Sequence, residues 1–148
     1  MKMEFIEYLE SVGITEVLHE RIESIQELFR KMCPDEIKDI FITEYTEEDG
    51  TREYERLCFF SEKYFMDARN FMTQYDLTIN PIKEKIYYLN IKKQDYDFER
   101  ATEKSRFAVH CLLDVAGVNV SIDMKSSKQN CDHLRDIIYK YLVPNLVE

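Results

Sequence analysis

The sequence has no tryptophan, few chain-breaking residues and none of the common catalytic signatures. Its 148 residues include 3 glycines and 3 prolines, which excludes collagen-like and low-complexity chains and leaves little material for a glycine-rich phosphate loop. No Gly-x-Ser-x-Gly, His-Glu-x-x-His or Cys-x-x-Cys sequence occurs. These absences favour a non-catalytic protein, although they leave its enzymatic status open, and we expect no cofactor and no metal.

Long apolar runs are also missing. Nowhere do about 18 apolar residues follow one another, as a membrane-spanning helix requires, and the first residues alternate charged with apolar side chains. We therefore expect no signal peptide, no membrane partner and a cytoplasmic location. The four cysteines are widely and irregularly spaced, and in this setting we expect reduced thiols rather than disulfides.

Charge is unevenly distributed along the chain. Residues 1–80 carry 9 basic and 19 acidic side chains, whereas residues 81–130 carry 9 basic and 7 acidic ones. The formal net charge of -9 argues against nucleic acid as a partner bound through bulk charge. In the less acidic part, aromatic and basic residues alternate, which makes a candidate binding strip for an acidic peptide or a set of lysines protecting an edge strand. The candidate binding residues are Lys92, Lys93, Tyr96, Arg100 and Lys104.

Apolar residues spaced three and four apart predict two helices in an N-terminal segment, residues 1–34. The first covers residues 3–12, and the second begins after Thr15 and ends at Cys33-Pro34, because the residue before a proline is disfavoured in a helix. The apolar stripe of the second helix, which includes Ile22 and Phe29, could pack on the rest of this chain or on another copy of it. The sequence leaves both arrangements open.

The pattern then changes to the period of two that is typical of strands. Between the first two predicted strands, Asp49-Gly50 supplies the positive φ that a tight turn needs. A closing amphipathic helix follows at residues 128–142. The predicted strands, which together cover residues 37–124, are Ile37–Thr46, Arg52–Phe60, Lys63–Arg69, Asp76–Asn80, Lys83–Lys93, Ser105–Val115 and Gly117–Met124.

We therefore predict one α+β domain over residues 1–148. It would contain N-terminal helices, a curled antiparallel sheet or partly open barrel of about seven strands, and a C-terminal helix that closes it. Seven strands followed by an amphipathic helix near Lys128–Leu142 resemble the pleckstrin-homology-like superfold. That resemblance implies two orthogonally packed sheets, and its members bind inositol lipids, peptides or other proteins. The lipid-binding members resemble one another in a basic first hairpin, whereas this chain has Glu47-Glu48-Asp49 there.

The sequence is also similar in size and acidity to type III secretion chaperones, which dimerise. Those proteins carry a helix within their strand series, and residues 70–82 are the one place here where such a helix could fit. Our leading hypothesis is a non-catalytic interaction domain that binds a protein partner or itself, with a homodimer as one form. The alternatives are a secretion-chaperone-like dimer and a carrier or enzyme with an apolar pocket lined by residues such as Tyr64, Tyr88 and Phe107.

Two further features bear on chemistry. Cys131 lies near the start of the last predicted helix, where the helix dipole would lower the pKa of a thiol and make it reactive. His110-Cys111 and Cys131-x-His133 form the one set that resembles metal ligands. Because neighbouring strand residues point to opposite faces, His110 and Cys111 are not expected to share a metal.

Overall fold

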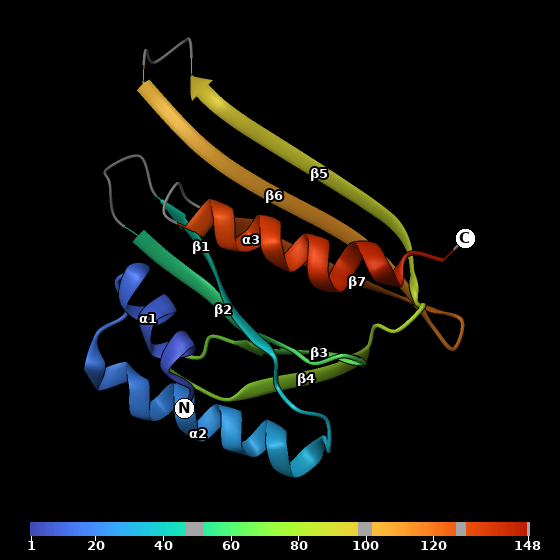
Figure 1. Ribbon diagram of the computed structural model, residues 1–148, viewed down its shortest axis with the longest axis horizontal. Coiled ribbons are helices and arrows are strands. Elements are labelled where there is room, and N and C mark those ends of the chain that lie inside the picture. Colours follow the sequence, from blue (N-terminus) through green and yellow to red (C-terminus); the bar gives the residue numbers. More distant parts are fainter. Residues whose placement is uncertain (47–51, 98–101, 127–129, 148) are drawn as a thin grey trace.

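The computed structural model of the protein describes residues 1–46, 52–97, 102–126 and 130–147 (Figure 1). Two helices begin the chain, α1 over Met3–Ser11 and α2 over Glu16–Met32. Gly13, with φ of 83°, allows the sharp turn between them. The predicted turn at Asp49-Gly50 lies outside the described residues.

Seven antiparallel strands follow and form two sheets. The first sheet has the order β1-β2-β3-β4 and the second has the order β5-β6-β7. The α+β prediction is therefore confirmed, with one refinement: the strands form two separate sheets that do not close into a barrel. The strands are β1 Asp39–Thr46, β2 Arg52–Phe60, β3 Tyr64–Arg69, β4 Asp76–Pro81, β5 Ile86–Asp97, β6 Thr102–Val115 and β7 Val118–Ser126.

The strand boundaries depart most from prediction at β5. This strand begins at Ile86 rather than Lys83, because Glu84 adopts φ of 58° in the turn that precedes it. It then continues to Asp97, four residues past the predicted end. Residues 70–82 contain a turn and β4 rather than a helix. This segment therefore lacks the helix that type III secretion chaperones carry within their strand series.

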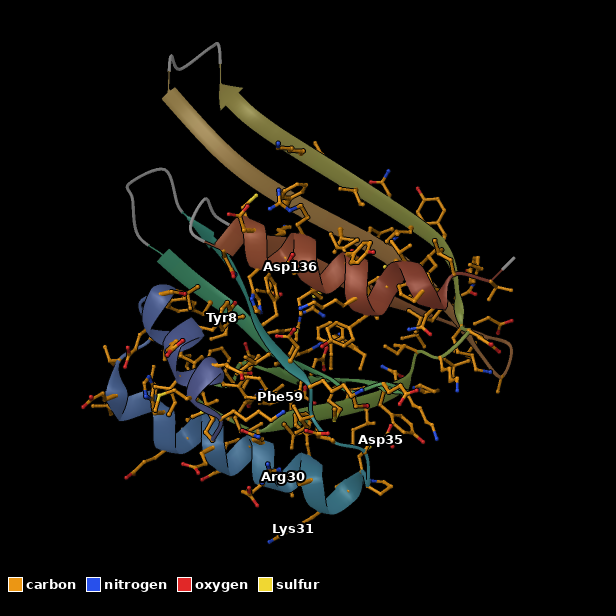
Figure 2. The ribbon with its side chains drawn as sticks, in the orientation of Figure 1. Tyr8, Arg30, Lys31, Asp35, Phe59 and Asp136 are labelled. Atoms are coloured by element: carbon orange, nitrogen blue, oxygen red, sulfur yellow. The ribbon has the colours of Figure 1, made fainter. Side chains whose placement is uncertain are left out.

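The four-stranded sheet is covered on one face by α1 and α2 (Figure 1). Phe29 of α2 packs edge-on against Phe59 of β2, with ring centroids 5.4 Å apart, and Phe59 lies on the α2 side of the sheet (Figure 2). Ile22, Ile25 and Phe29 are almost completely buried. The apolar stripe of α2 therefore packs on its own sheet, which leaves none of these residues for a second copy.

The C-terminal helix covers the other face of the same sheet and also contacts the second sheet. Its first part, α3, spans Cys131–Ile137 and packs against β1, β6 and β7. A π-helical turn over Ile138–Leu142 and a 3-10 turn over Val143–Asn145 continue it. Tyr141 stacks on Phe60 of β2 at 5.1 Å between ring centroids. Among the helices of the described residues, none is both long and apolar enough to cross a bilayer.

Candidate interaction surface

Four of the predicted binding residues belong to β5 and β6, and the structure describes the side chains of two of them, Lys92 and Lys93. Lys92 and Lys93 are exposed neighbours in β5, paired with Ala108 and Phe107 of β6, and therefore project to opposite sides. The Lys93 ammonium lies 5.6 Å from the Phe107 ring centroid, on the side of the sheet that contains the core. Lys92 and Lys93 therefore belong to different faces of the second sheet.

The other predicted residues are less completely placed. Tyr96 belongs to β5 and pairs with Glu103, and Lys104 belongs to β6, so their backbone positions are known. Arg100 lies outside the described residues. A binding role for these five residues stays a prediction.

Large exposed apolar side chains on β5 are a feature that sequence reasoning missed. Tyr87, Tyr88 and Ile91 are 46%, 46% and 47% exposed. The ladder is irregular between Ile86 and Tyr88, and both tyrosines contact outer-face residues, Tyr87 through Asn119 and Tyr88 through His110. No local period of the sequence signals this arrangement. These residues lie on the strand that forms the outer border of the second sheet in Figure 1.

The edge strand of the first sheet, β1, is covered by side chains from two helices. Asn130, at the start of α3, donates from Nδ2 to Ile42 O at 2.8 Å. Tyr8 of α1 accepts from Ile42 N at 2.9 Å, and its hydroxyl donates to Asn130 Oδ1 at 2.7 Å. His133 Nε2 donates to Ile40 O at 2.6 Å. Side chains thus replace the neighbouring strand that β1 lacks, and Figure 2 shows Tyr8 between α1 and β1.

The other end of the second sheet, β7, is also protected. Arg56 of β2 donates from Nη2 to Asp123 O at 2.5 Å, so a guanidinium group caps the β7 backbone. The same guanidinium lies 3.4 Å from Asp67 Oδ2 on β3. On the first sheet, the edge strand β4 is short and ends at Pro81, which has no N–H to offer.

The outer edge of β5 is different. At its start Val147 N donates to Ile86 O at 2.7 Å, which occupies only the first residue of the strand. For residues 87–92, which the structure describes, the backbone bonds to β6 and to nothing on the other side. β5 therefore presents open hydrogen-bonding groups next to exposed apolar side chains, the combination that other edges avoid.

The alternation of the β5–β6 ladder identifies which β5 groups face outward. Asp114 N donates to Lys85 O, so the backbone of Asp114 points toward β5. By the two-residue period, Leu112, His110 and Ala108 of β6 also point toward β5, and their register partners bond back to them. The alternate β5 residues, Leu89 and Ile91, therefore direct their N–H and C=O groups to the open side.

The candidate chemical groups do not assemble into a catalytic or metal site. Among the described residues, no group of three or more potential ligands is placed to hold a metal ion. His110 Nδ1 lies 2.6 Å from Asp123 Oδ1 on the exposed face of the second sheet, whereas Cys111 is buried on the opposite face. His133 stacks on Tyr8 at 4.1 Å and is used by the β1 edge.

The hypothesis of a reactive Cys131 is wrong, because it required a lowered thiol pKa and the pKa is raised. This thiol is 8% exposed, and burial, followed by the nearby Asp132 carboxylate, raises its pKa. Its helix, α3, is also short, so the dipole offsets little of that cost. Burial likewise raises the pKa of Cys58 and of Cys111 to about 12. All four cysteines are free and buried.

The residues suggested for an apolar pocket do not face a common space. Phe107 belongs to the core face of the second sheet, whereas Tyr88 lies on its outer face, where its ring packs edge-on against His110 at 6.0 Å. Tyr64 belongs to β3 of the other sheet. These three residues therefore do not support the hypothesis of a carrier or enzyme with an apolar pocket.

Comparison of the sequence with protein-family models and curated proteins, and of the chain with solved structures, finds no match.

Proposed function

We propose that this chain is a non-catalytic interaction domain that binds an extended segment of a protein partner as an added strand along β5. The observation that carries this proposal is the contrast between edges. β1, β4 and β7 are each capped or shortened, whereas the backbone of β5 is open beside Tyr88 and Ile91. Strand addition to an exposed edge is a common mode of peptide recognition, in which backbone hydrogen bonds supply affinity.

Side chains on both faces of β5 would contribute to recognition. Ile91 lies on the core side of the sheet, beside the partly buried Leu89, and would contact apolar residues of the partner. Tyr88 and Lys92 lie on the outer face and would contact the alternate residues. The partner segment would therefore alternate two kinds of side chain, as an added strand must.

We also propose that the fold is pleckstrin-homology-like. Its support is the division of seven strands into groups of four and three, followed by a helix that contacts both groups. In this chain α1 and α2 are additions that cover the outer face of the first sheet. An experimental structure that shows the two sheets packed orthogonally would support this assignment, and aligned sheets would overturn it.

The binding proposal is tested with displayed peptides and one proline variant. Peptides selected on the purified chain from a phage library are synthesised and titrated by fluorescence anisotropy. Ile91→Pro removes an outward N–H without removing a bond to β6, so it should weaken binding at least about tenfold while the domain stays folded. Ser121→Pro is the matched control, because Ser121 has the outward position on β7 two residues before Asp123.

The outcome distinguishes the edge from the rest of the surface. Loss of binding in Ile91→Pro alone supports strand addition at β5. Equal binding by wild type, Ile91→Pro and Ser121→Pro would overturn the proposal, and so would a library that yields no binding peptide. Circular dichroism of each variant confirms that it is folded.

A further inference from the structure

We infer that the occupant of the β5 edge, when no partner is bound, is β5 of a second copy of this chain, paired antiparallel with Asn90 opposite Asn90. This inference rests on the proposed function, because it uses the same open edge. The two three-stranded sheets would join into one sheet across a two-fold axis. The direction of the backbone groups, the residues that the pairing brings together and the lysines that it keeps apart support this arrangement.

The backbone geometry permits this arrangement. Leu89 and Ile91 both point outward, and in the inferred register Leu89 of each copy faces Ile91 of the other. An antiparallel pair of outward residues exchanges two hydrogen bonds, and the two-fold axis generates the second such pair. Asn90 points its own backbone toward β6, so the two Asn90 residues form the closer, non-hydrogen-bonded kind of pair.

Side chains on both faces of the joined sheet fit the register. On the core side, the exposed Ile91 gains contact with Leu89 of the second copy, so apolar surface is removed from water. On the outer side, Lys92 faces Tyr88 of the second copy, where an ammonium and an aromatic ring attract each other. Each such cross-strand pair favours the register modestly.

Charge excludes the neighbouring register that would otherwise compete. Moving the two-fold axis from Asn90 to Lys92 places Lys92 opposite Lys92 of the second copy, which is destabilising. Moving it to Ile91 pairs Ile91 with Ile91 but places Leu89 opposite Lys93 and Lys92 opposite Asn90, so the contact between Lys92 and Tyr88 is lost. In the inferred register neither Lys92 nor Lys93 faces another lysine, so these residues disfavour the register centred on Lys92 without preventing pairing.

The pairing is expected to be short and weak. Val147 occupies the outer edge at Ile86, and the β5–β6 ladder has irregularities between Ile86 and Tyr88 and between Gln94 and Tyr96. The regular stretch between them limits the interface to the low end of the size range, where complexes are transient. Since self-pairing uses the groups that a partner would bond, the two must compete, and peptide affinity should fall as protein concentration rises.

The test is a disulfide across the two-fold axis. Residues in a non-hydrogen-bonded antiparallel pair have Cα atoms about 4.5 Å apart, within the range of a disulfide. Full-length Asn90→Cys should therefore form a covalent dimer under mild oxidation, whereas Ser121→Cys, exposed on the same face but on β7, should not. The native thiols are buried, so they provide little background. Ile91→Cys reports the register centred on Ile91.

Sedimentation velocity of the unmodified chain over about 1 to 500 µM, the range of weak interfaces, supplies the second readout. A concentration-dependent dimer that Ile91→Pro abolishes and Ser121→Pro retains supports the inference. Cross-linking of Asn90→Cys no faster than Ser121→Cys, faster cross-linking of Ile91→Cys, or a monomer throughout overturns it. If the chain is monomeric yet Ile91→Pro loses the selected peptides, self-pairing fails while the proposed function stands; loss of neither property contradicts both.

Discussion

The edge strands β1 and β5, one from each sheet, differ in how their outer backbone groups are bonded. β1 is closed by Tyr8, Asn130 and His133, which bond to its outward backbone groups. β5 is bonded on its outer side only at Ile86 within residues 86–92. The three side chains that cover β1 are buried or half-buried, so its edge belongs to the core. The edge of β5 belongs to the surface and is free to accept another strand.

The largest expected effect comes from removing the side chain that bonds β1 most completely. Asn130→Ala leaves Ile42 O without its donor and the Tyr8 hydroxyl without its acceptor, both in the buried interior. Each buried unsatisfied group costs about 1–3 kcal/mol, so the free energy of unfolding should fall by roughly 2–5 kcal/mol. Urea denaturation measures this loss.

The matched control for that change is Asn119→Ala. Asn119 also accepts a hydrogen bond from a tyrosine, Tyr87, at 2.8 Å, but it does so on the exposed surface. Its removal should change the free energy of unfolding by less than about 0.5 kcal/mol. Equal losses in the two variants would mean that β1 is no better protected than the surface.

A comparable effect is expected from Tyr8→Phe. The ring and its stacking on His133 remain, while Ile42 N loses its acceptor and Asn130 Oδ1 loses its hydroxyl donor. The cost should be roughly 2–5 kcal/mol, the penalty for two buried unpaired groups. Tyr87→Phe, which removes an exposed hydroxyl, provides the control. Thermal unfolding of both variants measures the difference, and a neutral Tyr8→Phe would contradict the assigned closure of β1.

Asp67, the partner of the arginine that caps β7, should give a pH-dependent effect. Burial raises the pKa of its carboxyl despite the attraction of Arg56. The folded state therefore holds a proton that the unfolded state loses near its ordinary pKa of about 3.9, so stability falls as pH rises above that value. Asp67→Asn lacks this proton equilibrium, and its stability relative to wild type should increase as pH rises from about 4 toward neutrality.

That dependence is measured by urea denaturation of both proteins across the acidic range. A constant difference at all pH values would show that the Asp67 carboxyl has an ordinary pKa. Glu62→Gln, exposed between β2 and β3, is the control for a carboxylate lost beside the same sheet.

The smallest effect is expected at the open edge itself. Ile91 is 47% exposed, so Ile91→Thr should change the free energy of unfolding by no more than about 0.5 kcal/mol at concentrations where the chain is monomeric. The comparison with β1 is sharpened if Asn130→Ala destabilises and Ile91→Thr does not. A loss above about 2 kcal/mol in Ile91→Thr would place Ile91 in the core and remove the basis for strand addition.

Much of the architecture was predictable, because helix and strand periods are local properties of the chain. The spacing of Ile22, Ile25 and Phe29 predicted α2, and β2 has the predicted boundaries, Arg52–Phe60. The start of β5 was not predictable from its apolar pattern, because the positive φ of Glu84 ends strand geometry there without a glycine to mark it. The strand that carries Lys92 and Lys93 was predicted, and in it these two neighbouring residues point to opposite faces.

The sequence by itself determined the order of helices and strands, the residues that alternate toward a core, and the absence of familiar catalytic motifs. Only the tertiary structure decided which sheet edges are closed. The closure of β1 joins Tyr8 to residues 34 and 122 positions away in the chain, and no local period encodes contacts at such separations. Whether a strand is covered or open depends on which distant groups reach its backbone. Within residues 86–92 of β5, the backbone N–H of Val147 reaches the outer side at Ile86, and the other residues of this stretch have no such partner.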